Sequence, residues 1–189
     1  MSFFKKSFNR QSGGYIKFFG LEKWFAALTP HQQKLLRQAR SDLTSADLSY
    51  TSETVSQFMS SCAGDIASQD IDFAEYLYHK ALEVEPDPVS RHYTLMSMAH
   101  FYKQQLSDPA KWFKTIQDDL KLLPAFAKAW QKQEGTDLPS YPAIEEMLRI
   151  LQGRGDLPEA LSLCKYARRL EVAGDWDRQI DELQLKMQD

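Results

Sequence analysis

The fold is decided by residues 155–167, which read GDLPEALSLCKYA. After the opening Gly-Asp, a small, a medium and a small residue follow at Ala160, Cys164 and Ala167, all on one face of a helix. The same spacing recurs at residues 74–81, where the chain continues to Pro86 as ALEVEP. Small residues let two helices approach closely, and a proline ends a helix so that the chain can turn. The repetition therefore predicts stacked antiparallel helix pairs.

Both segments resemble the second helix of a tetratricopeptide repeat (TPR), and the end of the earlier one is similar to the closing Ala-Leu-x-Leu-x-Pro of that family. The resemblance covers about residues 53–172. It implies three helix pairs: 53–68 with 70–85, 89–106 with 108–123, and 141–153 with 156–170. The middle pair departs from the family pattern, since Trp112 and Ile116 stand where smaller residues are usual. The family implies a right-handed α-solenoid of about three pairs, which needs a C-terminal capping helix, expected after Gly174. An N-terminal helical extension is expected to precede the solenoid.

The rest of the chain is also helical in pattern, so the fold class is all-α. Apolar residues recur every 3.6 residues in 55–68, 71–84, 91–106 and 109–123, and no segment alternates with a period of two. Thr29-Pro30-His31-Gln32 predicts a capped helix over 29–40, which follows a short helical piece near 21–28. Pro124 is expected to close the helix that starts at Pro109, and a separate short helix is expected over 126–133.

Composition divides the chain into three parts: a flexible basic arm (1–14), a helical segment with a connector (15–52), and the TPR-like domain (53–189). The connector is 41–52, in which six of twelve residues are Ser or Thr. Hydrophobic residues make up 43% of the chain, which excludes wholesale disorder. No apolar run approaches the ~20 residues of a membrane span, and the first residues lack the pattern of a secretory signal.

Charge is distributed unevenly although the net value is only −3. Residues 1–40 hold eight Lys or Arg residues and one acid, Glu22. Two interpretations stay open: the basic segment binds an external polyanion, or it lies against the acidic body or in solvent. Seven residues are the possible polyanion contacts: Lys5, Lys6, Arg10, Lys17, Lys34, Arg37 and Arg40. They carry the alternative function, a nucleic-acid-associated regulatory protein that uses residues 1–40.

The sequence contains no recognisable catalytic, metal-binding or phosphate-binding motif. We therefore expect that the protein is not an enzyme and has no catalytic residues, no metal and no cofactor. The four histidines form no i, i+3 or i, i+4 pair that could bind zinc, and no phosphate-binding glycine loop is present. The adjacent acids Asp118-Asp119 and Glu145-Glu146 are expected on solvated faces. Cys62 and Cys164 form no Cys-x-x-Cys motif and are expected to be buried thiols of a cytoplasmic protein.

The resemblance implies that the first helix of each pair lines a concave groove. Carried onto this sequence, the groove residues are Met59, Ala63, Ile66, Tyr93, Ser97, His100, Glu145, Arg149 and Gln152. The alternative is that Met59, Ile66 and Tyr93 are ordinary core residues. In the family, Lys, Asn and Arg side chains of the groove bind the terminal carboxylate of a peptide. Among the groove residues of this sequence, only Arg149 could contribute such a group. We therefore expect a non-enzymatic protein-interaction module, a scaffold or adaptor that binds an unknown peptide or helix.

Overall fold

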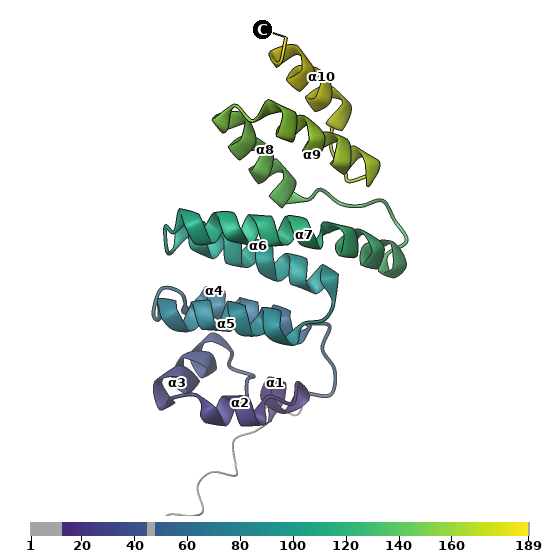
Figure 1. Ribbon diagram of the computed structural model, residues 1–189. Coiled ribbons are helices and arrows are strands. Elements are labelled where there is room, and N and C mark those ends of the chain that lie inside the picture. The colour runs from purple at the N-terminus through teal and green to yellow at the C-terminus, as the bar shows by residue number, and fades with distance from the viewer. Residues whose placement is uncertain (1–12, 45–47, 189) are drawn as a thin grey trace, which may run out of the picture. The chain divides into compact units, whose positions relative to one another are not determined.

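A computed structural model describes residues 13–44 and 48–188, and its secondary structure there consists of helices (Figure 1). The all-α prediction is confirmed for these residues. The chain divides into two compact units, unit 1 (Met1–Glu85) and unit 2 (Pro86–Asp189). The predicted domain 53–189 extends over both units. Most of the predicted arm 1–14, and residues 45–47 of the connector, lie outside the described residues.

Unit 1 contains α1 (Gly14–Phe18), α2 (Glu22–Ala27), α3 (Pro30–Ala39), α4 (Val55–Ile66) and α5 (Ile71–Val84). Unit 2 contains α6 (Pro88–Gln104), α7 (Pro109–Gln133), α8 (Pro142–Arg154), α9 (Leu157–Arg169) and α10 (Trp176–Lys186). The predicted pairs are present as α4–α5, α6–α7 and α8–α9, each with its two helices packed together. The last helix, α10, packs against α9.

Capping residues explain where several helices begin. Thr29 and Thr54 each accept a hydrogen bond from the backbone N–H three residues on, and a glutamine there closes the capping box. Asp70 and Asp108 cap α5 and α7 by the same backbone contact. Gly155 ends α8 with φ at +79°, a conformation that glycine adopts without strain.

Pro124 does not end its helix, contrary to the prediction. α7 runs from Pro109 through Pro124 to Gln133 as one helix, so the separate helix expected over 126–133 is its last part. A proline inside a helix costs about 3 kcal/mol because it removes a hydrogen bond and crowds the preceding turn. Leu123 and Phe126 on either side are buried, whereas Pro124 is exposed. Burial of these two flanking side chains offsets the cost and holds both halves in one helix.

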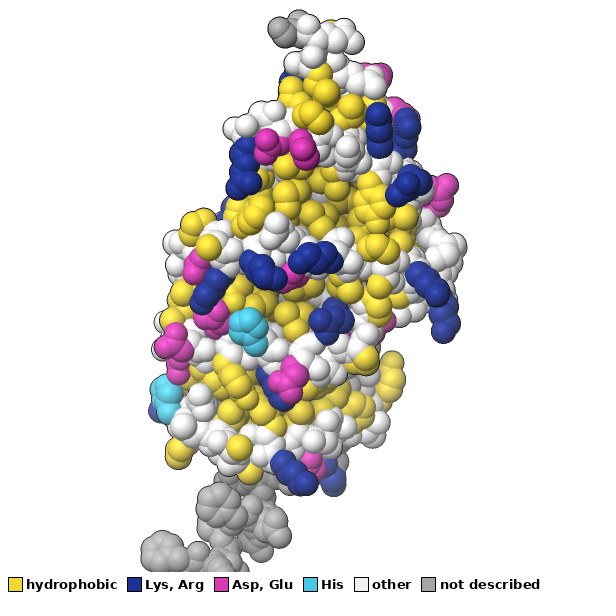
Figure 2. All heavy atoms as spheres, in the orientation of Figure 1, with side chains coloured by type: hydrophobic (Ala, Val, Ile, Leu, Met, Phe, Trp, Pro, Cys, Tyr) yellow, Lys and Arg dark blue, Asp and Glu magenta, His cyan; other side chains and the backbone are white. Residues whose placement is uncertain are grey.

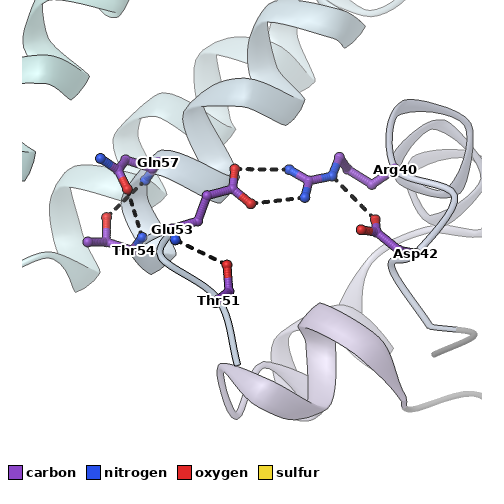
Figure 3. Close-up of polar contacts among 6 residues, drawn as sticks. All are labelled: Arg40, Asp42, Thr51, Glu53, Thr54 and Gln57. Carbon is purple, nitrogen blue, oxygen red and sulfur yellow. Dashed lines mark hydrogen bonds and ion pairs between the residues drawn. The ribbon is translucent and has the colours of Figure 1, made fainter. Parts of the chain in front are cut away.

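Arg40 joins the N-terminal segment of unit 1 to α4 (Figure 3). Its Nη1 and Nη2 donate to the two carboxylate oxygens of Glu53 at 3.1 and 2.9 Å, and its Nε donates to Asp42 at 3.4 Å. The guanidinium lies 4.3 Å from the ring centre of Tyr15 and 5.5 Å from that of Phe58, the latter on α4. Planar stacking and a two-pronged ion pair suit arginine and no other side chain. Arg40 is therefore a structural residue.

The small residues that predicted the pairing are buried in both units. Ala74 and Ala81 on α5, and Ala160, Cys164 and Ala167 on α9, have no exposed surface. The core of unit 2 joins side chains from α6, α7, α8, α9 and α10. Figure 2 shows that hydrophobic side chains of unit 2 also reach the surface on the face drawn, over α7, α8 and α9. None of the helices in the described ranges combines the length and the apolar content needed to cross a membrane.

Candidate functional site

The candidate site is an open pocket of about 260 Å³ in unit 2, which lies between α6, α7 and α8. α6 and α8 supply two of its walls, and α7, which packs against both of them, supplies the rest of the lining. Its lining is mostly apolar and includes Leu95, Met96, Ala99, Trp112, Ile116, Pro142 and Ala143. The polar lining residues are His100, Lys103, Gln104, Asp119 and Glu146. We call this the α6–α8 pocket.

A second opening of about 340 Å³ lies next to the α6–α8 pocket, at the loop between α6 and α7. Lys103 and Trp112 belong to both openings, and Tyr102 and Pro109 add further apolar surface. The Lys103 Nζ lies 5.1 Å from the centre of the Trp112 ring, and the Lys111 Nζ lies 5.6 Å from that of Tyr102.

Charged residues form one rim of the α6–α8 pocket. The Lys103 Nζ on α6 donates to Glu146 Oε1 on α8 at 3.2 Å, and Arg149 Nη1 donates to Glu146 Oε2 at 2.8 Å. Burial works to raise the pKa of the Glu146 carboxyl, but the hydrogen bonds from Arg149 and Lys103 outweigh burial and lower it. Glu146 is therefore an anion that two cations share.

A buried polar network lies at the floor of the α6–α8 pocket. Asp119 lines the pocket, yet it is only 2% exposed. His92 Nδ1 lies 2.9 and 3.0 Å from its two carboxylate oxygens, and the Tyr141 hydroxyl lies 2.7 Å from Oδ1 and 2.8 Å from its carbonyl oxygen. The rings of His92 and Tyr141 are stacked 4.1 Å apart. This network joins α6, α7 and the residue before α8.

Tyr141 acts in this network as a hydrogen-bond donor. Burial raises the pKa of its hydroxyl, and the charge and hydrogen bond of Asp119 raise it further. The hydroxyl therefore stays protonated and satisfies an acceptor that burial removes from water. The expectation that Asp119 lies on a solvated face was wrong. Asp119 points inward, where it is the polar partner of His92 and Tyr141, and the adjacency of two acids in the sequence cannot reveal this.

The predicted groove residues of unit 2 lie beside the α6–α8 pocket more often than in it. His100 lines it. Tyr93 and Ser97 are exposed on α6, where the Ser97 hydroxyl bonds the Tyr93 carbonyl oxygen at 3.0 Å. On α8, Arg149 lies at the rim of the pocket, where it donates a hydrogen bond to Glu146. Glu145 is exposed. Gln152 accepts a hydrogen bond of 3.3 Å from Lys186 on α10. The pocket is lined by a face of α6 and of α8 that neighbours the predicted one. This face lies at the edge of the buried apolar residues of each helix.

The predicted groove residues of unit 1 do not line an open surface. Met59, Ala63 and Ile66 are all 0% exposed. They are core residues, which corrects the groove prediction and agrees with the alternative stated for Met59 and Ile66. The reason is that α4 packs against α3 as well as α5, so it has little free surface for these three side chains.

The predicted polyanion contacts are only partly described. Lys5, Lys6 and Arg10 lie outside the described residues. Lys17 and Lys34 are exposed, and the Arg37 guanidinium lies 5.1 Å from the centre of the Phe25 ring. Arg40 is held by Glu53, Asp42 and two aromatic rings, which corrects its assignment as a contact for an external anion.

Comparison with known proteins supplies one relative. An uncharacterized protein of Aquifex aeolicus (strain VF5) is 27% identical over 188 residues, which is 92% of this chain and 92% of that protein. No family model and no solved structure matches the chain. The similarity along nearly the whole length indicates that both units of this chain have counterparts in the relative.

Proposed function

We propose that this chain is a non-enzymatic protein-interaction module, in which unit 2 binds a peptide or helix of a partner protein in the α6–α8 pocket. The observation that carries the proposal is the pocket itself. It is open to solvent and mostly apolar, and three helices of one unit form it. Such a hydrophobic groove between helices is a common site for the apolar face of an amphipathic segment.

The resemblance to TPR proteins adds support, because their helix pairs bind peptides on the side of the first helix of each pair. α6 and α8 are the first helices of their pairs, and both supply walls of the pocket. The right-handed α-solenoid and the cytoplasmic location belong to the same proposal. The cytoplasmic location rests on the usage of Cys62 and Cys164, which are free and buried.

A peptide selection tests the function and does not require an identified partner. The probe is a library of random 12-residue peptides, displayed on phage and selected on the full-length protein. Met96→Trp narrows the pocket, since Met96 is a partly exposed lining residue. Met187→Trp is the matched control, because Met187 is exposed at the C-cap of α10 and does not line the pocket.

We expect selected peptides that bind the wild type and the Met187→Trp protein equally well. Met96→Trp should lower the affinity of these peptides about tenfold or more, since a blocked pocket excludes the side chain that anchors the peptide. Recovery only of peptides that bind all three proteins alike would contradict the proposed site. An unfolding curve of each variant in urea shows whether unit 2 is intact.

A further inference from the structure

The rim of the α6–α8 pocket has more positive than negative charge available to a ligand. Lys103 and Arg149 converge from α6 and α8 on the single carboxylate of Glu146. The side chains of Lys103 and Arg149 are 43% and 63% exposed, whereas that of Glu146 is 21% exposed. Each cation therefore has donors that still face solvent. A second carboxylate at this rim would meet two cations that Glu146 neutralises only in part.

The interior of the pocket has the opposite character. Met96, Ala99 and Ile116 give it an apolar lining beside the Trp112 ring. Asp119 is the acidic residue at its floor, and the carboxylate oxygens of Asp119 are within hydrogen-bond distance of Tyr141 and His92. An apolar side chain can enter here with no polar partner of its own. The apolar interior and the cationic rim lie next to each other, as the two faces of an amphipathic segment do.

We propose that the partner of the α6–α8 pocket is an acidic amphipathic segment, whose internal Asp or Glu pairs with Lys103 and Arg149 while a neighbouring apolar side chain packs beside Trp112. The inference rests on the proposed function and specifies its partner. The Trp112 ring, which already lies beside the Lys103 ammonium, brings the apolar and the ionic contact within one helical turn of a ligand. The side chain of the segment supplies the acid, so a free C-terminus is not needed.

The selected peptides test this inference directly. In the phage library the C-terminus of each peptide is fused to the coat protein, so a carboxylate can come only from a side chain. We expect the peptides that depend on Met96 to be enriched in Asp and Glu relative to the unselected library. Met96-dependent peptides without that enrichment would overturn the inference and leave the proposed function standing. Failure to recover any Met96-dependent peptide would overturn both.

Glu146→Gln gives a second test, in which a gain of binding cannot result from misfolding. The substitution removes the charge that competes for Lys103 and Arg149. The affinity for an acidic selected peptide should therefore rise about three- to fivefold, which is the size of effect expected from two exposed ion pairs.

Lys103→Glu combined with Arg149→Glu should lower the affinity for the same peptide about tenfold or more, because the peptide's acids then face acids at the rim. Lys165→Glu, on an exposed residue of α9 outside both openings, is the control of equal sign. Unchanged affinity in Glu146→Gln together with unchanged affinity in the double variant would contradict the inference.

Discussion

α4 of unit 1 and α6 of unit 2 are each the first helix of a pair, but their surfaces differ. Three residues on one face of α4, Met59, Ala63 and Ile66, are fully buried. α6 keeps an open flank, where Met96 and Lys103 line the pocket. The difference arises because α4 has a further packing partner, α3, that covers part of its surface. Helix pairing alone therefore does not decide which face binds a ligand; the neighbours of the pair do.

The two units also use the same ionic chemistry in different ways. Arg40 is 16% exposed, binds Glu53 through two hydrogen bonds and lies next to the rings of Tyr15 and Phe58. Arg149 is 63% exposed and binds Glu146 through one. A sheltered bidentate pair stabilises a fold, whereas an exposed pair contributes little and exchanges readily with solvent or a ligand. The comparison predicts that Arg40 matters for stability and Arg149 for binding.

The largest effect is expected from Phe58→Ala on α4. Phe58 is fully buried and its ring stacks with that of Tyr15 at 5.2 Å. Its removal should lower the free energy of unfolding of unit 1 by about 3–5 kcal/mol, because a large cavity is left. Urea unfolding followed by circular dichroism measures this. Phe18→Ala, at a residue that is 41% exposed, should cost less than about 1 kcal/mol. Equal losses in the two variants would break the distinction between core and surface in unit 1.

Arg40→Ala should lower the stability of unit 1 by about 2–4 kcal/mol, because Glu53 then keeps a partly buried charge without its cation. The measurement is again urea unfolding at neutral pH, with Lys34→Ala on the exposed side of α3 as the control. A loss below about 0.5 kcal/mol would mean that Arg40 is an ordinary surface residue.

The pH dependence of this variant sharpens the same comparison. The hydrogen bonds from Arg40 lower the pKa of the Glu53 carboxyl despite its burial. A lowered folded-state pKa gives stability that is fully present above the unfolded value of about 4.3 and is lost as the pH falls through the folded value. The gap in stability between the wild type and Arg40→Ala should therefore narrow below about pH 4. A gap that is constant from pH 7 to pH 3 would contradict this.

Tyr141→Phe in unit 2 removes one hydroxyl group and leaves the ring. Asp119 then loses a donor at a site that is 2% exposed, so unit 2 should lose about 1–3 kcal/mol of stability. Tyr93→Phe is the matched control at a residue that is 41% exposed, and it should change stability by about 0.5 kcal/mol or less. If both variants unfolded like the wild type, the network beneath the pocket would have no structural role.

The smallest effect on stability is expected at the rim of the pocket. Lys103→Ala and Arg149→Ala should each change the free energy of unfolding by about 0–1 kcal/mol, since exposed ion pairs are weak. The same variants should bind the acidic peptides that were selected on the wild type more weakly. A large loss of stability with unchanged peptide binding would contradict the binding role assigned to Lys103 and Arg149.

Local patterns in the sequence predicted most of the helices. Threonine–glutamine capping and proline at the first helical position mark helix starts that depend only on neighbouring residues. The burial of Ala74 and Ala160 was also predictable, because small residues at helix crossings form a recognisable pattern. Pro124 misled the prediction because the contacts of Leu123 and Phe126 decide the outcome there, and tertiary packing overrides propensity.

The candidate site was harder to predict from the sequence. His100 and Arg149 were found because the family resemblance pointed to α6 and α8. Lys103, Trp112 and Asp119 were missed, since their roles depend on how three helices converge. The spacing of apolar residues shows which stripe of a helix is buried, but the edge of that stripe becomes a pocket only where a neighbouring helix leaves space.

The indole N–H signal of Trp112 offers the most direct test of the pocket. Its resonance in a ¹⁵N spectrum can be assigned with the Trp112→Phe variant and followed while an acidic, Met96-dependent peptide is added to the full-length protein. We predict that the Trp112 signal moves with the peptide concentration, while that of Trp24 in unit 1 stays in place. A Trp112 signal that is unmoved at saturating peptide would show that the α6–α8 pocket is not where the partner binds.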